Sequence, residues 1–126
     1  MAIWQGKSNR KSTGGRIVPS KSKRKFEIGR EKQYTKLGTQ SLRQYRVCGG
    51  NVKVGILAAE FANVIDKKTG VIKKVKIVKV KANPADPNYV QRNIINKGAT
   101  IETEIGSAIV TSRPGQDGAI NAILLA

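Results

Sequence analysis

Histidine is absent from this sequence of 126 residues, and cysteine occurs only once, at Cys48. A disulfide within the chain needs two thiols, a Cys/His zinc site needs several such ligands, and the usual hydrolase triads need a histidine. The sequence therefore excludes all three, and we expect neither a cofactor nor a bound metal. A lone thiol is typical of a reducing intracellular setting, in which Cys48 would be a small, inert residue of the core or of a sheet edge, with a reactive thiol as the alternative.

Long apolar segments are also missing. The apolar run at 122–126 covers only a few residues, whereas a membrane helix needs about 20. Residues 1–7 lack the apolar stretch of a secretory signal. We expect a cytoplasmic protein with no membrane partner and no small-molecule substrate.

Acidic residues are scarce. Lysine and arginine number 24 against 8 aspartates and glutamates, which gives a formal net charge of +16 and a sequence pI near 10.4. So much repulsion in a chain that has room for only one domain and a tail indicates a polyanionic partner, and nucleic acid is the obvious one.

The positive charge is concentrated near the N-terminus. Residues 1–46 carry 13 basic and 2 acidic residues (net +11), and residues 47–126 carry 11 and 6 (net +5). Between Gln5 and Lys25 there are eight basic residues, no acid and very few apolar ones. Such a segment cannot bury enough surface to offset the entropy lost on ordering. We therefore expect residues 1–42 to be a disordered, basic, RNA-binding extension, although a merely solvated tail is the alternative.

Residues 43–126 have the pattern of a small all-β domain. From about Gln44, β-branched residues recur with a period of two between glycine-containing turns, which is typical of strands. A barrel of roughly six strands, built from antiparallel hairpins, would bury a core and leave no sheet edge. The strands are expected over 52–65, 71–81, 100–105, 107–112 and 119–125.

The expected strand over 71–81 changes phase. Val75 and Ile77 are apolar at odd positions, whereas Val78 and Val80 are apolar at even positions. A β-bulge at 77–78 would absorb one residue and keep the valines on the core face. It would also place four lysines on the opposite face, where they either guard a sheet edge or contact phosphates: Lys74, Lys76, Lys79 and Lys81.

Glycine and proline mark the expected turns. They predict turns at 49–51 and 66–70, a tight hairpin turn at 106–107 and one helical turn at 89–92. The loop 113–118 contains a Pro-Gly and an Asp-Gly signal. We expect a type II turn with Gly115 at positive φ there, leaving Arg113 and Gln116 to project toward RNA.

Several blocks of the chain together resemble small-subunit ribosomal protein eight of the archaeal and eukaryotic type, which is unrelated to the bacterial-type protein eight. They are Trp-Gln-Gly-Lys-Ser at 4–8, Thr-Gly-Gly-Arg at 13–16, Gly-Arg-Glu at 29–31, Gly-Gly-Asn-Val-Lys at 49–53, the segments 88–90, 92–95 and 97–98, and Ser-Arg-Pro-Gly-Gln-Asp-Gly at 112–118. The chain is similar to the short archaeal form, since it lacks the insertion of the eukaryotic members. The resemblance implies a β-barrel with a basic N-terminal extension that binds 16S ribosomal RNA in the 30S subunit beside other ribosomal proteins.

The residues expected to bind RNA are basic side chains, flexible glycines and side-chain amides, with Trp4 as a base-stacking ring or as a contact that packs the extension onto the domain. In the extension they are Trp4, Lys7, Arg10, Lys11, Thr13, Gly14, Gly15, Arg16, Lys21, Lys23, Arg24, Lys25 and Arg30. In the barrel they are Arg46, Asn51, Lys53, Asn88, Arg92, Asn93, Lys97, Arg113 and Gln116.

Two other functions compete with this one. A metal-dependent nuclease needs clustered carboxylates, but Asp66, Asp86 and Asp117 lie in turn sequences that already explain them. We therefore do not expect an enzyme. A non-ribosomal architectural protein shares the charge argument, and preference for structured ribosomal RNA over duplex DNA would distinguish the two.

Overall fold

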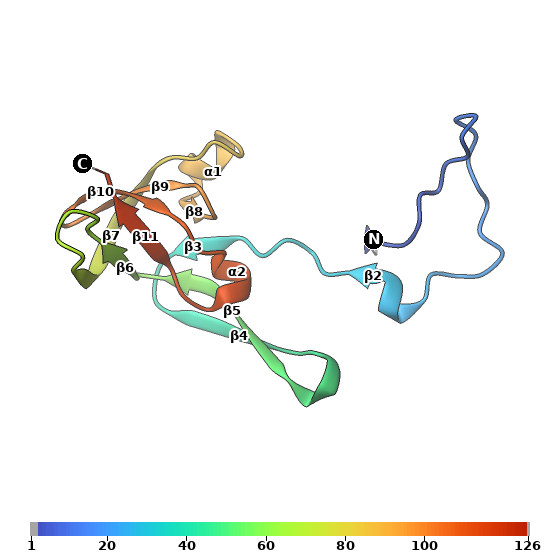
Figure 1. Ribbon diagram of the computed structural model, residues 1–126, viewed down its shortest axis with the longest axis horizontal. Helices are drawn as coiled ribbons and strands as arrows, with labels where there is room; N and C mark the ends of the chain where they lie inside the picture. Colours follow the sequence, from blue (N-terminus) through green and yellow to red (C-terminus); the bar gives the residue numbers. More distant parts are fainter. Residues whose placement is uncertain (1–2, 126) are drawn as a thin grey trace. The chain divides into compact units, whose positions relative to one another are not determined.

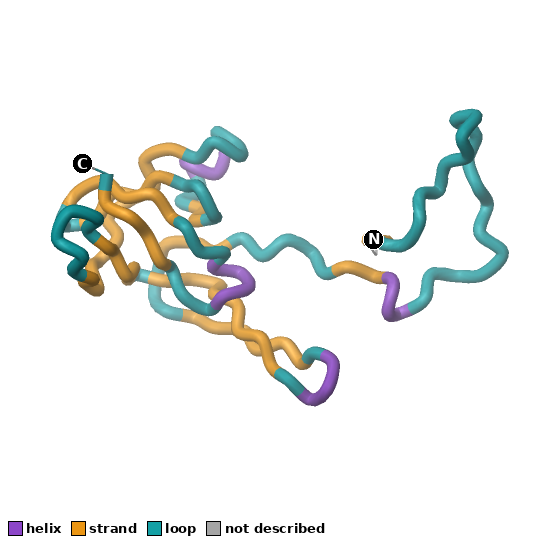
Figure 2. Tube along the Cα trace, in the orientation of Figure 1, coloured by secondary structure: helices purple, strands orange, loops and turns teal. Residues whose placement is uncertain are grey.

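The computed structural model describes residues 3–125 and divides the chain into two compact units, Met1–Lys32 and Gln33–Ala126. Figure 1 labels the helices and strands, and Figure 2 shows that loops make up most of the first unit. The first unit contains β1 (Ile3–Trp4), the 3-10 turn η1 (Lys25–Glu27) and β2 (Ile28–Gly29). The second contains β3 (Thr35–Leu37), β4 (Ser41–Arg46), η2 (Cys48–Gly50), β5 (Val52–Ala59), β6 (Phe61–Ile65), β7 (Ile72–Ala82), α1 (Asn88–Gln91), β8 (Ile94–Ile95), β9 (Thr100–Thr103), β10 (Gly106–Val110), α2 (Pro114–Asp117) and β11 (Asn121–Leu124).

The second unit is an all-β body, as expected, built around a closed barrel. The barrel has five strands in the order β10-β11-β6-β7-β9, with β9 paired to β10. A separate four-stranded sheet has the order β4-β5-β3-β8. The expected count of about six barrel strands is therefore wrong. So is the expectation of antiparallel hairpins throughout, because β11 pairs with β6 and β3 pairs with β5 in parallel.

The expected strand over 52–65 is broken into two strands that belong to different sheets. The chain bends at Glu60, so β5 belongs to the open sheet and β6 to the barrel. Both still contribute to one core, which joins Ile56 of β5 to barrel residues such as Val64 and Ile101. The bend lets one continuous apolar segment serve two sheets.

The bulge expected in β7 is confirmed. The pairing of β7 with β9 shifts register between Ile77 and Lys79, so that Val78 is skipped and is 56% exposed. Val75, Ile77 and Val80 are buried. The lysines at 74, 76, 79 and 81 are all exposed, so the extra residue is absorbed without turning a lysine into the core.

Two of the expected turns are confirmed, and one is misplaced. Gly49 and Gly50 both have φ of 75°, and Gly70 closes the β6–β7 turn at φ 70°. The β9–β10 turn is at 104–105, not at 106–107. Gly106 is already the first residue of β10, where it pairs with Thr103.

The loop 113–118 is a single helical turn, not a type II turn. The carbonyl of Arg113 accepts hydrogen bonds from the N–H groups of Gln116 and Asp117. Proline suits the first helical position because it needs no N–H there, and Gly118 ends α2 at a left-handed φ of 70°. The expectation of a positive φ at Gly115 is wrong, because Gly118 supplies it.

The first unit has local structure but no core. β1 pairs with β2, and the N–H of Gln5 donates to the carbonyl of Glu27. No residue in 3–32 is buried, and Val18 and Phe26 are 88% and 84% exposed. The expected disorder of residues 1–42 is not confirmed. The expected boundary at 42–43 falls inside β4. The second unit begins earlier, at Gln33, and its buried Thr35 precedes the expected boundary.

Gly55 of β5 lies against α2, and this contact leads to a stability prediction. A Cβ at Gly55 would lie 2.6 Å from the carbonyl oxygen of Gly115. Gly55→Ala should therefore lower the free energy of unfolding by about 1–3 kcal/mol, as overpacking does, measured by urea denaturation. Gly15→Ala is the control, because a Cβ there meets nothing closer than 3.7 Å. Equal stability of the two variants would contradict the contact.

The β6–β7 turn predicts a pH effect. The N–H of Lys68 and the hydroxyl of Thr69 donate to the carboxylate of Asp66 and lower its pKa below the ordinary value. Because the folded pKa is depressed, this carboxylate stabilises the fold above its unfolded pKa, and that contribution is lost as pH falls through the folded pKa. Thr69→Val should raise the pKa of Asp66 in a carboxyl NMR titration. Thr39→Val, at an exposed residue elsewhere, should leave it unchanged, and an unaltered pKa in Thr69→Val would exclude the hydroxyl as a cause.

Candidate nucleic-acid interface

The segment 9–17 of the first unit is a tight basic loop. The N–H of Gly14 donates to the carbonyl of Lys11 at 2.9 Å, and the N–H of Ile17 donates to the carbonyl of Asn9 at 2.7 Å. Gly14 has φ of 85°, which a residue with a side chain rarely adopts. The guanidinium of Arg10 donates to the carbonyl of Gly14 at 2.9 Å. The loop therefore holds its arginine in place while its backbone stays open.

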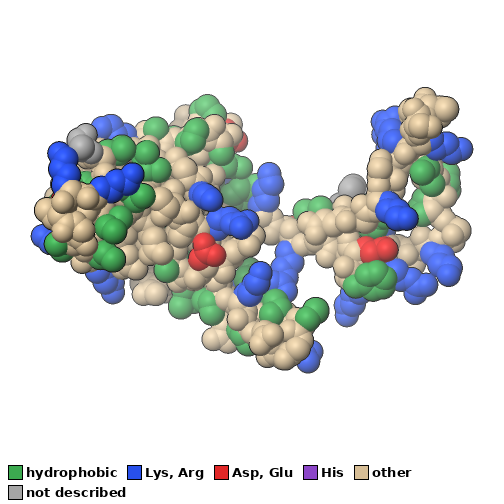
Figure 3. All heavy atoms as spheres, viewed as in Figure 1, with side chains coloured by type: hydrophobic (Ala, Val, Ile, Leu, Met, Phe, Trp, Pro, Cys, Tyr) green, Lys and Arg blue, Asp and Glu red, His purple; other side chains and the backbone are tan. Residues whose placement is uncertain are grey.

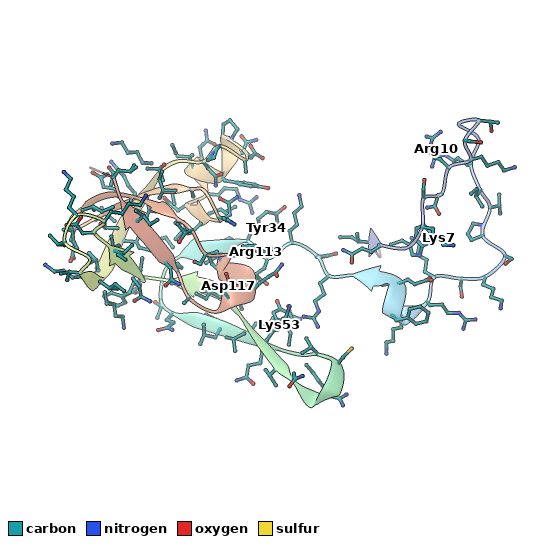
Figure 4. All side chains as sticks on the ribbon, in the orientation of Figure 1. Lys7, Arg10, Tyr34, Lys53, Arg113 and Asp117 are labelled. Carbon is teal, nitrogen blue, oxygen red and sulfur yellow. The ribbon has the colours of Figure 1, made fainter. Side chains whose placement is uncertain are left out.

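Positive charge in the first unit is largely uncompensated. Residues 1–32 contain ten basic and two acidic residues, a net of 10 − 2 = +8. Glu27 already accepts hydrogen bonds from Trp4 and from the N–H of Arg24. The predicted residues of this unit other than Trp4 are all exposed: Lys7, Arg10, Lys11, Thr13, Gly14, Gly15, Arg16, Lys21, Lys23, Arg24, Lys25 and Arg30. Figure 3 shows blue side chains along this segment, and Figure 4 labels Lys7 and Arg10 within it.

Trp4 has a partner inside its own unit. Its indole N–H donates to the carboxylate of Glu27 at 3.3 Å, and its ring lies against Gly6 so closely that a Cβ there would overlap it. The indole is half-buried. Trp4 thus has a structural contact with residues of the first unit itself.

The β4–β5 hairpin is a second basic element and projects from the rest of its unit (Figure 1). It carries the predicted Arg46, Asn51 and Lys53, all exposed, and residues 39–59 contain no acid. The amide of Asn51 donates to the carbonyl of Cys48 at 3.1 Å and closes the tip. Cys48 is an exposed free thiol at that tip, not a core residue.

Aromatic rings gather near α1. Tyr34 and Tyr89 meet edge to face at 5.6 Å, and the guanidinium of Arg92 lies 5.9 Å from the centre of the Tyr34 ring. A hydrogen bond with Tyr34 raises the pKa of the Tyr89 phenol above its ordinary value. Arg92 was predicted from the sequence, but the two tyrosines were not, because 55 residues separate them in the chain.

The other predicted residues around α1 differ in exposure. Asn88 and Lys97 are exposed, as expected of ligands. Asn93 is half-buried at φ 49°, and its side-chain oxygen accepts a hydrogen bond from the N–H of Val80. Asn93 therefore supports β7 just beyond the bulge.

Two predicted residues lie at α2: Arg113 directly precedes the helical turn, and Gln116 is part of it. Arg113 and Gln116 both lie on the surface, and Figure 4 shows Arg113 and Asp117 at this helical turn. The backbone N–H of Arg113 donates to the carboxylate of Asp117 at 2.7 Å. The carboxylate of Glu102, a possible partner for the Arg113 guanidinium, instead pairs with Lys79 at 3.2 Å.

The lysines at 74, 76, 79 and 81 form a surface that we call the lysine face. β7 lies between β6 and β9 in the closed barrel, so it is not the edge strand of a sheet. This arrangement weakens the edge-guarding explanation. Within the described residues, one exposed ion pair, Lys79 with Glu102, neutralises part of this face, and such pairs contribute little to stability.

The family model of ribosomal protein S8e matches residues 4–125. The chain belongs to this family. Small ribosomal subunit protein eS8 of Methanocorpusculum labreanum is 58% identical over 123 residues, covering 98% of both chains. The proteins of the same name from Picrophilus torridus and Methanosphaerula palustris are each 54% identical, and they cover 99% and 98% of this chain and 100% and 98% of their own.

Membership of S8e confirms the family resemblance found in the sequence, with relatives from archaea, and identifies the chain as a ribosomal protein rather than an enzyme. Residues 3–125 contain no group of three Cys, Asp or Glu side chains placed to hold a metal ion. The helices described in this range are too short to cross a membrane.

The exposure of Arg113 leads to a prediction about RNA binding. Because its side chain is exposed, Arg113→Ala should leave the melting temperature unchanged but weaken binding to small-subunit ribosomal RNA by about 1–3 kcal/mol, as a lost charge-assisted contact does. Asp117→Ala, which removes the acceptor of the Arg113 N–H, should instead lower stability by roughly 0.5–1.5 kcal/mol. Both quantities are measured on both variants, by thermal denaturation and by filter binding. Lower stability with unchanged affinity in Arg113→Ala would remove α2 from the interface.

Proposed function

We propose that this protein is a structural constituent of the small ribosomal subunit and binds 16S ribosomal RNA through its basic first unit and through loops of the barrel. Its relatives carry the name of a small-subunit ribosomal protein, and its net charge of +16 suits a polyanion. Other small-subunit proteins would be its neighbours.

The observation that carries this proposal is the combination of charge and missing core in the first unit. Residues 1–32 have a net charge of +8, and none of the described residues among them is buried. A unit that buries no apolar side chain obtains little stability from the hydrophobic effect. An anionic surface would supply what the unit lacks by neutralising its lysines and arginines.

The first unit would then be disordered in the free protein and ordered on RNA. Its local hydrogen bonds, such as those of loop 9–17, are too few to offset the entropy of ordering a segment of this length. On RNA, the open backbone at Gly14 would allow close approach to phosphates. The half-buried Trp4 would hold β1 and β2 together.

The barrel would add contacts of a different kind. The β4–β5 hairpin, the region of α1 and the α2 turn each present basic or amide side chains. Because the major groove of A-form RNA is deep and narrow, such groups would recognise phosphates, riboses and the shape of the RNA more than base sequence. The lysine face adds a broad phosphate-binding surface.

Membership of the S8e family decides against the alternative of a non-ribosomal architectural protein. The same charges would still bind duplex DNA, so competition between a 16S ribosomal RNA fragment and duplex DNA of equal length tests whether binding is selective for RNA. Equal affinity would show that charge alone, and not the shape of ribosomal RNA, drives binding.

Loop 9–17 predicts a change in salt dependence. Replacing Arg10, Lys11 and Arg16 with glutamine in the full chain should reduce the slope of log affinity against log salt by about 2–3, because each lost phosphate contact removes about 0.7–0.9. The matched control replaces Lys67, Lys68 and Lys73, which removes the same charge from the β6–β7 turn and the start of β7. It should change the slope less. Equal changes in both variants would show that net charge alone, and not this loop, sets the affinity.

A further inference from the structure

A small hollow lies on the outside of the barrel, beside β6 and β7. Its volume is about 210 Å³, and its lining includes Phe61, Asn63 and Lys74, with Gln40 and Glu60 among the polar residues and the buried Ile120 among the apolar ones. Of these residues, only Lys74, a member of the lysine face, was expected from the sequence as a possible phosphate contact. All of them belong to the second unit.

Phe61 has no role in the core. Along β6, Ala62 and Val64 are buried, while Phe61 and Asn63 point to the opposite side and are exposed. The Phe61 side chain is 43% exposed, and the Lys74 ammonium lies 5.0 Å from the centre of its ring. An exposed aromatic ring beside a cation is the pairing that binds single-stranded nucleic acid, since the ring stacks on a base and the cation reaches the phosphate.

An amide pair beside the ring offers polar groups for a base edge. The side-chain N–H of Asn63 donates to the side-chain oxygen of Asn121 at 3.2 Å. The parallel pairing of β11 with β6 places these two residues opposite each other. Within the described residues, this bond leaves the Asn63 oxygen to accept and the Asn121 amide to donate. A neighbouring acceptor and donor complement the donor and acceptor edge of adenine.

The volume of the hollow limits the size of the ligand that it can bind. Sites for whole cofactors or drug-sized ligands usually enclose about 300–1,000 Å³, which is more than this hollow provides. A single planar ring suits it better. The carboxylate of Glu60 on the rim would accept a hydrogen bond from an exocyclic amino group, whereas it would repel a phosphate, so the base and not the phosphate should enter.

We propose that this hollow binds one unstacked nucleobase of single-stranded RNA, with Phe61 stacking on the base, the Asn63–Asn121 pair contacting its edge and Lys74 contacting the adjoining phosphate. The inference rests on the proposed function as an RNA-binding protein and adds a base-contacting site to phosphate recognition. Adenine is the base used to test it.

The first experiment is an NMR titration of the full chain with adenosine 5′-monophosphate, in parallel with inorganic phosphate. The nucleotide should shift the side-chain amide signals of Asn63 and Asn121 and the ring signals of Phe61, and phosphate alone should not. Equal shifts with phosphate would show an anion site and overturn the proposal. No shift with the nucleotide would also overturn it and would favour a protein neighbour over this surface.

The second experiment measures binding of a single-stranded oligoadenylate to full-length variants. Phe61→Leu keeps the apolar bulk but removes the aromatic face, and it should weaken binding about 5- to 150-fold, the range measured for loss of one stacked base. Phe26→Leu is the control, because Phe26 is an exposed ring in the first unit, and it should have a smaller effect. Equal losses in the two variants would overturn the proposal.

The arginine and lysine variant of loop 9–17 separates this inference from the proposed function. If that variant loses affinity for 16S ribosomal RNA while Phe61→Leu shows no loss with oligoadenylate, the protein binds RNA but the hollow does not hold a base. If neither variant weakens binding, both proposals fail. The titration of the unaltered protein decides the matter even if Phe61→Leu does not fold.

Discussion

Closure of the barrel depends on one parallel strand pair. β11 is the last strand of the chain, yet it lies beside β6, with Asn121 opposite Asn63 and Ile123 opposite Ile65. Without that pair, β6 and β11 would each leave a row of unpaired backbone groups at a sheet edge. The pair also buries Val64 and Ala122 side by side in the core and brings two asparagine side chains together on the surface. The three residue pairs of this parallel ladder thus determine contacts both in the core and on the surface.

The two units use their charge differently. In the first unit, charge is carried by loops with no buried residue beneath them. In the second, part of the charge is carried by a strand whose other face packs into a core, as Lys76 is between the buried Val75 and Ile77. Side chains held on a rigid strand suit contacts that depend on the shape of the partner. A segment without a core suits contacts that form while the segment itself folds on its partner. Under the proposed function, the two kinds of surface would together bind RNA without the need for a large core.

Features set by neighbouring residues were predictable from the sequence. The bulge in β7 follows from the phase change at Val78, and the β6–β7 turn follows from Asp66 and Gly70, because both involve only local backbone geometry. The exposure of the predicted basic residues was also foreseeable, since a lysine or arginine needs only its own polarity to remain on the surface. Their roles in RNA binding stay predictions.

Features set by distant residues were not predictable. The break at Glu60, the parallel strand pairs and the five-stranded count all depend on which strands meet after the chain has folded. Asn93 has a polar side chain of the kind expected in a surface ligand. Its side-chain oxygen instead accepts a hydrogen bond from the N–H of Val80, 13 residues earlier. The α2 turn was missed because Pro-Gly and Asp-Gly favour β-turns locally, whereas packing against β5 selects one helical turn.

The bulge in β7 has a consequence for how this family can tolerate insertions and deletions. Loss of the single codon for Val78 would leave Ile77, Lys79, Val80 and Lys81 alternating without interruption, so every side chain would keep its face. Loss of Lys76 would instead reverse the inward and outward pattern on one side of the deletion. Val78 therefore has little influence on which side chains are buried. Its role is the local bend in β7, which pairs with β6 before the bulge and with β9 from Ile77 onward. A one-residue length difference at this position among homologues would mark a change in barrel curvature, while the same difference two residues earlier would mark a change in the core.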